Sequence, residues 1–300
     1  GHSSRGGAAG TIFLKRGDEA RGTLVADNKS TSAGTHTYTV LPTIASAMVT
    51  DITENSISYL GAGWVSDIYA GYMINPSRDD EDATLTDNPV FVVASNSDDT
   101  LVFTENGILQ SATLGDSFST FFIFKAMRLS GKAALSTSGD ILLTGAGASL
   151  EINDDASLTA GIVELYEGAT GVSLDSGILN LESGGIKISG DLNLSGDSEL
   201  NTGPAGLTVS GDGVLAGTSS TQQGSGAYSF AGDLDLKGSA ELTQGSAPLT
   251  VDGDLWMDPS TQILASETTA AAPGKVHIET TNLYISSGAK IDVSEKGYPA

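Results

Sequence analysis

The most regular feature that could do chemistry is a column of aspartates. The dipeptide Gly-Asp recurs every 21 residues, and its carboxylates belong to Asp191, Asp212, Asp233 and Asp254. On stacked strands such side chains would lie about 4.8 Å apart, where like charges repel unless solvated or bridged by a cation. Either Ca²⁺ bridges the column, or each carboxylate accepts backbone N–H bonds at a turn. We favour the turn, because Ca²⁺ takes six or more oxygens and no EF-hand or nonapeptide calcium loop is present.

A second calcium candidate is the densest acidic run, which contains Asp79, Asp80 and Asp82. Runs of this kind are more often solvated loops than metal sites. Thiolate metal sites and disulfides are excluded because the chain has no cysteine. We therefore expect that the protein has no cofactor, and calcium is the one candidate that remains open.

Aromatic side chains are the candidates for binding a ligand by stacking. They are Trp64, Tyr72 and Trp256. Trp256 lies between Leu255 and Met257, so it should point outward and stand alone on its coil. A covering contact with a turn or with the inserted module is the alternative role for Trp256, and exposed patches are also where a neighbouring subunit docks.

Acid/base chemistry on polysaccharides is the enzymatic alternative. The carboxylates that could share an outward face are Asp233 with Asp235 and Asp252 with Asp254. Glycoside hydrolysis needs two carboxyls about 5–9 Å apart in a cleft, and β-elimination needs basic groups. The basic candidates are scattered, at Lys187, Lys237 and Lys275. No nucleophile, base and orienting group come together, so we expect no catalytic residues and no enzyme.

The elements that would position these residues follow the same 21-residue period. Apolar columns keep its register, and three short strands per period are typical of a parallel β-helix, in which each coil stacks on the last. We expect a right-handed cylinder of about eight coils over residues 126–300. In the last coil, the period places Gly274-Lys275 in the Gly-Asp series, Val276 and Ile278 in the second strand, and Tyr284 in the third.

The expected organisation is all-β, with three parts. Residues 1–34 form a Gly-rich arm and the first β-helix coils, including 11–14 and 22–25. Residues 35–124 are richer in aromatics and longer strands, which indicates an inserted, non-repetitive β module. We expect Trp64, Tyr69, Tyr72 and Met73 to form either its small core or its seam against the β-helix. Residues 125–300 form the parallel β-helix.

The charge balance excludes one class of function. Lys plus Arg number 14 and Asp plus Glu number 37, giving a formal net charge of −23. Such a field repels nucleic acid and anionic membrane surfaces. No run approaches the roughly 18 apolar residues of a membrane span. We expect neither nucleic-acid binding nor membrane insertion.

Several segments carry a resemblance to a known group of proteins. They are 6–14, 64–76, 91–96, 114–118 and 291–298, together with the closing coils. These look like pieces of very large repetitive bacterial surface proteins, in which β-helical stretches alternate with Gly-rich loops and small inserted modules. The resemblance implies an extracellular or cell-surface location, a structural or adhesin-like role, and no catalytic residues.

The expected function is therefore a structural or adhesive module. A β-helix ends in unpaired strand edges that are either capped or used for association. We expect end-to-end association between copies or with neighbouring modules of the same chain. The alternatives are a carbohydrate-active enzyme, either a polysaccharide lyase or a glycoside hydrolase, and a glycan-binding module.

Overall fold

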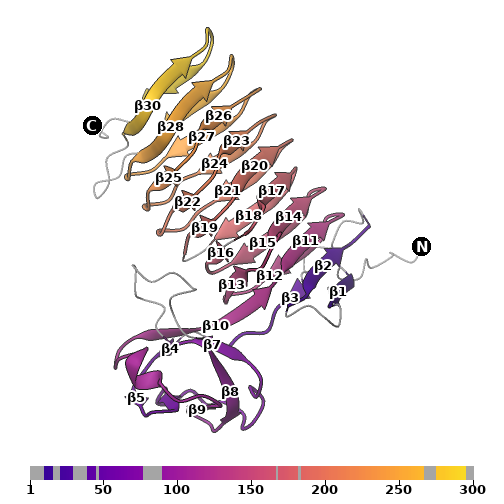
Figure 1. The fold of residues 1–300 in the computed structure, drawn as a ribbon, viewed down its shortest axis with the longest axis vertical. Coiled ribbons are helices and arrows are strands. Elements are labelled where there is room, and N and C mark those ends of the chain that lie inside the picture. The colour runs from indigo at the N-terminus through magenta and orange to yellow at the C-terminus, as the bar shows by residue number, and fades with distance from the viewer. Residues whose placement is uncertain are drawn as a thin grey trace, which may run out of the picture. The chain divides into compact units, whose positions relative to one another are not determined.

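The computed structural model shows an all-β chain whose parallel strands form a β-helix, or β-solenoid (Figure 1). It has about seven turns, with corresponding residues roughly 21 positions apart. The fold class expected from the repeat is thus confirmed. The structure describes residues 10–15, 21–29, 39–44, 47–76, 90–166, 168–181, 184–266 and 275–294. The chain divides into two compact units.

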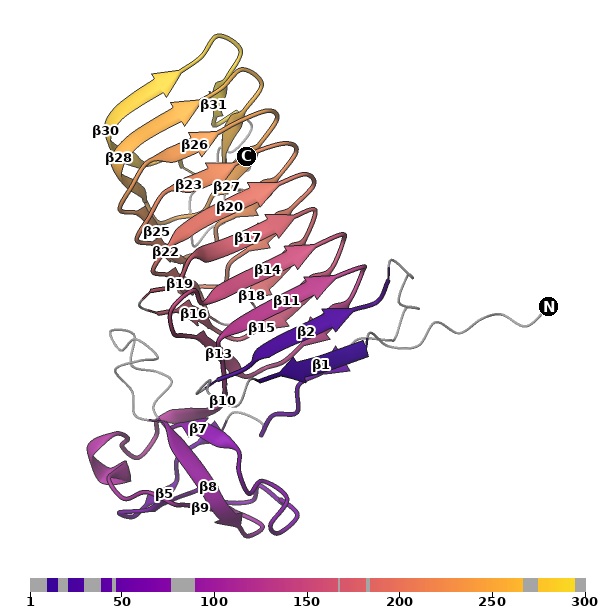
Figure 2. The same ribbon diagram turned by 45° about the vertical axis from the view of Figure 1, so that its right-hand side comes forward.

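Three parallel ladders build the β-helix in the first unit, and we name them A, B and C in the order in which one coil contributes to them. Figure 2 shows ladder A along its length. Ladder A consists of β2 (Thr23–Asp27), β11 (Ala126–Ser130), β14 (Ser149–Asn153), β17 (Gly171–Asp175), β20 (Asp191–Ser195), β23 (Gly213–Leu215), β26 (Leu234–Leu236) and the second halves of β28 (Leu249–Met257) and β30 (Ile278–Ile285).

Ladders B and C complete each coil. Ladder B consists of β3 (Thr39–Val40), β12 (Ala134–Ser136), β15 (Ser157–Ala160), β18 (Ile178–Leu181), β21 (Glu199–Asn201), β24 (Ser220–Gln222), β27 (Glu241–Gln244), β29 (Gln262–Ala265) and β31 (Lys290–Asp292). Ladder C contains β16 (Val163–Leu165), β19 (Ile186–Ile188), β22 (Leu207–Val209), β25 (Tyr228–Phe230) and the first halves of β28 and β30.

Alternation along each strand decides which side chains enter the core. In β26, Leu234 and Leu236 are buried and Asp235 between them points outward. Stacking repeats this choice in every coil, so ladder A carries two inward columns. Column 1 is Leu24, Met127, Leu150, Val172, Leu192, Gly213, Leu234, Leu255 and Leu283; column 2 is Ala26, Leu129, Ile152, Leu174, Leu194, Leu215, Leu236, Met257 and Ile285.

Left-handed backbone turns the chain between ladders A and B. Gly196, Gly217 and Gly238 have φ values of 62°, 74° and 71° and recur at the same place in successive coils. Glycine adopts this region without the steric cost that a Cβ brings. The spacing of these glycines therefore holds the corner at a constant shape from coil to coil.

The N-terminal strand departs from the expected coils. β1 (Gly10–Leu14) pairs antiparallel with β2, whereas β2 runs parallel to β11. The expectation of a coil is right for β2 and wrong for β1. Eight residues separate β1 from β2, and a parallel crossover needs a dozen or more, so the two strands form a hairpin.

The last described coil is longer than the coils that precede it from β11 onward. Leu255 lies beside Leu283, 28 positions further on. The sequence-based columns are therefore wrong here: Ile278 lies beside Leu249, and Tyr284 lies in ladder A rather than B. Val276 precedes β30 instead of lying in ladder A, and the Gly-Asp series does not continue at Gly274-Lys275, because Asp254 lies beside Asn282. Twelve residues separate β29 from β30, whereas four separate β27 from β28 in the coil before. The longer coil is one reason for seven turns rather than eight.

The second unit comprises residues 41–123 and 137–142 and is built on antiparallel pairing. Its fully buried core includes Ile57, Ile74, Leu101 and Phe118. Its elements are β4 (Ala47–Met48), β5 (Asp51–Ile52), β6 (Ser56–Ser58), β7 (Met73–Asn75), β8 (Phe91–Asn96), β9 (Thr100–Phe103), a 3-10 turn (Ile108–Gln110), β10 (Ser117–Phe124) and β13 (Asp140–Leu143), the last two each ending one residue beyond the unit.

The unit boundaries place one segment differently from the sequence analysis. The first unit comprises 1–40, 124–136 and 143–300, so residues 137–142 group with the second unit rather than with the β-helix. Within this segment, the buried Asp140 accepts a hydrogen bond from Ser119. Across the described residues no helix has the length and apolar character needed to cross a bilayer.

Candidate functional site

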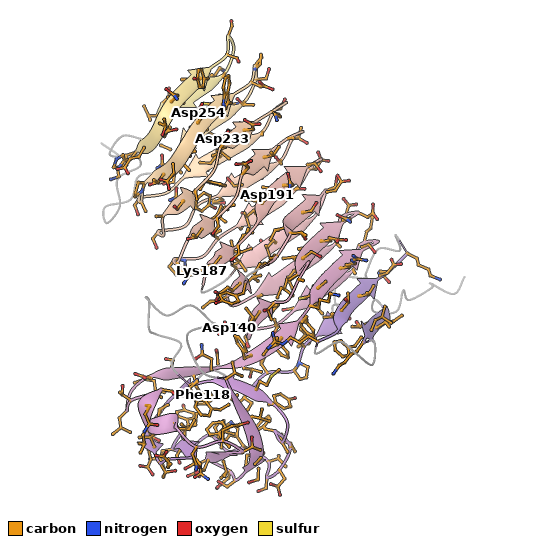
Figure 3. All side chains as sticks on the ribbon, viewed as in Figure 1. Phe118, Asp140, Lys187, Asp191, Asp233 and Asp254 are labelled. Atoms are coloured by element: carbon orange, nitrogen blue, oxygen red, sulfur yellow. The ribbon has the colours of Figure 1, made fainter. Side chains whose placement is uncertain are left out.

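The aspartate column lies at the corner where ladder C passes into ladder A, with Asp191, Asp233 and Asp254 on one side of the β-helix (Figure 3). The Oδ1 atoms of Asp191, Asp212 and Asp233 each accept a hydrogen bond from the backbone N–H of the next aspartate along the column. The three N···O distances are 3.0, 2.9 and 2.8 Å, from Asp191 to Asp254. The carboxylates thus accept backbone N–H bonds, as the turn interpretation expects, but they do so from the following coil and not within their own turn.

The glycine of each Gly-Asp pair makes room for this bond. A Cβ on Gly232 would lie 2.1 Å from Oδ1 of Asp212, and one on Gly211 would lie 2.1 Å from Oδ1 of Asp191. The two glycines also continue the backbone ladder, with Gly232 N–H donating to the carbonyl of Gly211 at 3.1 Å. Neither has a positive φ. Their role is to allow the close approach between coils.

In the described part of the chain, no set of side chains forms a coordination shell for calcium. No group of three His, Asp or Glu side chains there is placed to hold a metal ion. The acidic run with Asp79, Asp80 and Asp82 lies outside the described residues. What the structure shows for the column is hydrogen bonding between coils.

The basic residues considered for acid/base chemistry lie on different coils. Lys187 is on β19, and Lys237 follows β26 and pairs with Asp235, with 2.7 Å between Nζ and Oδ2. Lys275 precedes β30, near His277, whose Nε2 lies 3.1 Å from Glu279 Oε1. These side chains pair along one strand or stand apart, and the structure does not gather them around a common point.

Trp64 and Tyr72 are placed in the second unit. Both are partly buried and pack against its core. The Trp64 ring meets Phe118 and Tyr69 edge to face, with centroids 6.1 and 5.9 Å apart, and Tyr69 meets Tyr72 in the same way at 5.5 Å. Edge-to-face contacts of this kind contribute roughly 0.5–1.5 kcal/mol each beyond area burial. These aromatics hold the module together in this structure.

Trp256 has a partner that the fixed repeat did not reveal. Its ring stacks on that of Tyr284 at a centroid distance of 3.8 Å and an interplanar angle of 12°. The two side chains point outward from neighbouring strands and remain 44% and 41% exposed. Trp256 points outward as expected, and its partner comes from the next coil, because the 28-residue spacing brings Tyr284 of β30 beside it.

Buried polar groups at the corner between ladders B and C were missed from the sequence. Gln223 and Gln244 are buried and occupy equivalent positions 21 residues apart. Gln244 donates from Nε2 to the carbonyls of Ala247 and His277 and accepts from the His277 N–H at 2.9 Å. Nearby, Thr202 donates to the hydroxyl of Tyr228, and burial raises the pKa of Tyr228 well above its ordinary value. The 21-residue spacing of the glutamines was the available signal.

The last described coil leaves the end of the core uncovered. Leu283 and Ile285 end the two inward columns of ladder A and are 41% and 49% exposed, whereas Leu255 and Met257 in the coil before are buried. Ile291 ends the matching column of ladder B and is also exposed. Among the described residues, β30 and β31 have a strand partner along one edge only.

The opposite end of ladder A is apolar as well. Every residue of β1 is exposed, and Ile12, Phe13 and Leu14 are each more than half exposed. Within the described ranges β2 is the strand that pairs with β1, so the second edge of β1 is open there. Unpaired edges of this kind are where sheets extend.

The fold and these ladders define a parallel β-helix repeat protein. Comparison of the chain with models of protein families, with curated proteins and with solved structures finds no match.

Proposed function

We propose that this chain is a structural and adhesive β-helix module of a bacterial surface protein, acting outside the cell. Its coils supply length and stiffness, and its outer faces and ends supply contact surface. Each coil adds about 4.8 Å of rod and is tied to the next by backbone bonds and by buried columns. The resemblance of the Gly-rich and closing segments to large repetitive surface proteins supports the same role.

The observation that carries this proposal is the uncovered end of the core at β30 and β31. A column of leucine and isoleucine that is buried through the β-helix stops at Leu283 and Ile285 with large apolar areas exposed. Burying such a side chain fully contributes about 1.5–3 kcal/mol, so another β layer placed on this coil would be stabilised by the contact. Apolar contact surface of this kind at the end of a β-helix supports a structural role.

Hydrogen exchange tests the proposal without assuming what supplies the layer. If the end is covered in the functioning protein, the amides of β30 should exchange about as slowly as those of β20 and β23. Exchange of alternate β30 amides at the rate of a free strand edge, at every protein concentration, would overturn the proposal. β20 and β23 serve as internal controls because both of their edges are paired.

A second candidate, glycan binding, is favoured by the stacked pair of Trp256 and Tyr284. The pair presents exposed aromatic area beside the charged pair of Asp235 and Lys237, since Trp256 lies next to Asp235 in ladder A. Trp256 fluorescence should then change on titration with neutral oligosaccharides, and Tyr284→Ala should abolish the change. No response to any oligosaccharide at millimolar concentration would remove this candidate.

A further inference from the structure

We infer that the layer covering β30 is β1 of a second copy of this chain, so that copies stack head to tail through ladder A. This inference rests on the proposed function and names the partner that the function leaves open. It commits to one geometry, in which β1 of one copy lies antiparallel to the Asn282–Ile285 segment of another. The other possible covers, a second C-terminal end or a different segment of the same chain, become outcomes of the test.

The two strands are the opposite ends of one ladder. Ladder A runs without interruption from β2 to the second half of β30, and β1 is hydrogen-bonded to the first strand of that series. Figure 2 shows β1 and β30 as the terminal strands of this face. Repeating the molecule along its own axis therefore brings the open edge of β1 to the open edge of β30.

The columns fix the register of the contact. Phe13 lies beside Leu24, the first member of column 1, and Leu283 is the last member of that column. Thr11 lies beside Ala26, the first member of column 2, and Ile285 is its last. Continuing both columns into a second copy sets Phe13 opposite Leu283 and Thr11 opposite Ile285.

The outward residues follow from the same register. Because side chains alternate along a strand, Ile12 comes opposite Tyr284 on the outer face. Tyr284 already stacks on Trp256 at 3.8 Å, and Ile12 is more than half exposed. The contact would thus extend an existing row of apolar outward side chains, while Phe13 and Leu283 close the core.

Charge at the two ends is complementary. The β1–β2 hairpin is bordered by the exposed side chains of Lys15, Arg21 and Lys29, with Asp27 as the acidic residue among its described neighbours. The end of ladder A at β28 and β30 is bordered by Asp252, Asp254, Asp258 and Glu279, with the exposed Lys275 as the basic residue just before β30. The net charge of −23 opposes random association, but in physiological salt it is screened beyond about 8 Å. Opposite charges at the ends therefore favour axial over lateral contacts.

Cysteine crosslinking tests the register directly, because the chain has no cysteine of its own. Ile12→Cys combined with Tyr284→Cys should give a ladder of covalent dimers, trimers and longer species under mild oxidation. Opposed residues of an antiparallel pair lie within the Cα separation that a disulfide requires. Ile12→Cys combined with Glu279→Cys is the matched control and should crosslink at least tenfold more slowly, since Glu279 lies five residues from Tyr284 on the same strand.

The single variants identify every other arrangement. Ile12→Cys alone and Tyr284→Cys alone should remain monomeric on oxidation, and an equimolar mixture of the two should give dimers but no longer species. Efficient dimers of Tyr284→Cys alone would show that two C-terminal ends meet, and this result would overturn the inference. Circular dichroism of each variant checks that the β-helix is intact.

The outcomes separate this inference from the proposed function. Slow hydrogen exchange of β30 without crosslinking between positions 12 and 284 would leave the covered end in place and reject β1 as its cover. Fast exchange of β30 at all concentrations would reject both. Slow exchange together with the 12–284 crosslink ladder supports both.

Discussion

The β-helix and the second unit bury their strands in two different ways. In the β-helix, a residue such as Leu236 has Leu215 and Met257 above and below it in the same column, so its surroundings are set by translation along the axis. In the second unit, Phe118 is surrounded by side chains from several strands and loops, among them Trp64 at 6.1 Å. The first core is periodic and one-dimensional, and the second is an irregular cluster.

The two kinds of core are vulnerable to substitution in different places. A one-dimensional stack distributes its stability over nearest-neighbour interfaces, so a defect is felt by the adjoining coils and an end always lacks one interface. A compact cluster has no such end, and a defect within it is confined to one cooperative unit. The exposed column ends at Leu283 and Ile285 belong to the first kind of architecture only.

The largest effect is expected from a charge placed within a column. Leu236→Asp should lower the free energy of unfolding by about 4–5 kcal/mol, because it buries an unpaired carboxylate between two apolar neighbours. Lys237→Gln is the matched control on the exposed corner and should change stability by no more than about 0.5 kcal/mol. Urea unfolding monitored by circular dichroism measures both. Similar losses for the two variants would contradict the inward register of β26.

A cavity in the second unit should be somewhat less costly and local. Phe118→Ala removes a fully buried ring and should cost about 3–5 kcal/mol. Hydrogen exchange should quicken in β6, β8 and β9 while the amides of β20 to β26 keep their protection. If the β-helix loses protection against exchange to the same extent, the two units are not separate cooperative regions.

A smaller effect is expected where the aspartate column passes over glycine. Gly232→Ala should destabilise by about 1–3 kcal/mol, because its Cβ would meet Asp212 Oδ1 at 2.1 Å and the Gly211 carbonyl at 2.8 Å. Asp212→Ala should cost about 1 kcal/mol through the lost bond to Asp233. When Gly232→Ala and Asp212→Ala are combined, the loss of stability should be smaller than the sum of the two single losses, because the clash between the new Cβ and Asp212 Oδ1 is gone. Strict additivity would count against the close approach described for this corner.

The smallest effect should come from calcium. The carboxylate column is engaged by backbone N–H groups, so EDTA or 5 mM CaCl₂ should each move the melting temperature by no more than about 1 °C. Differential scanning calorimetry gives the comparison. A fall of roughly ten degrees on chelation would show instead that a bound cation holds the coils together.

The β-helix, whose core is periodic, could be predicted from the sequence to a larger extent than the irregular second unit. The 21-residue recurrence of Gly-Asp was enough to predict the parallel β-helix and the strand order, because residues 21 positions apart in the sequence become neighbours in adjacent coils. The same reasoning failed at Tyr284, where a longer connection shifted the register, and at β1, where a short connection enforced a hairpin.

For the candidate sites, residue types alone identified the side chains but not their contacts. The aspartates were found, but their hydrogen bonds to the next coil and the role of Gly211 and Gly232 depend on distances between coils. The packing of Trp64 against Phe118 joins segments more than 50 residues apart in a region without a repeat, so periodicity gave no access to it. The open end at Leu283 was expected only as a general property of β-helices.

Sedimentation velocity across protein concentration can show whether another β layer completes the uncovered columns of β30. The native chain should shift to larger species as concentration rises, while Ile285→Asp, which places a charge on the end of column 2, should stay monomeric with an unchanged circular dichroism spectrum. A native chain that remains monomeric throughout, or an Ile285→Asp variant that assembles equally well, would contradict the addition of such a layer.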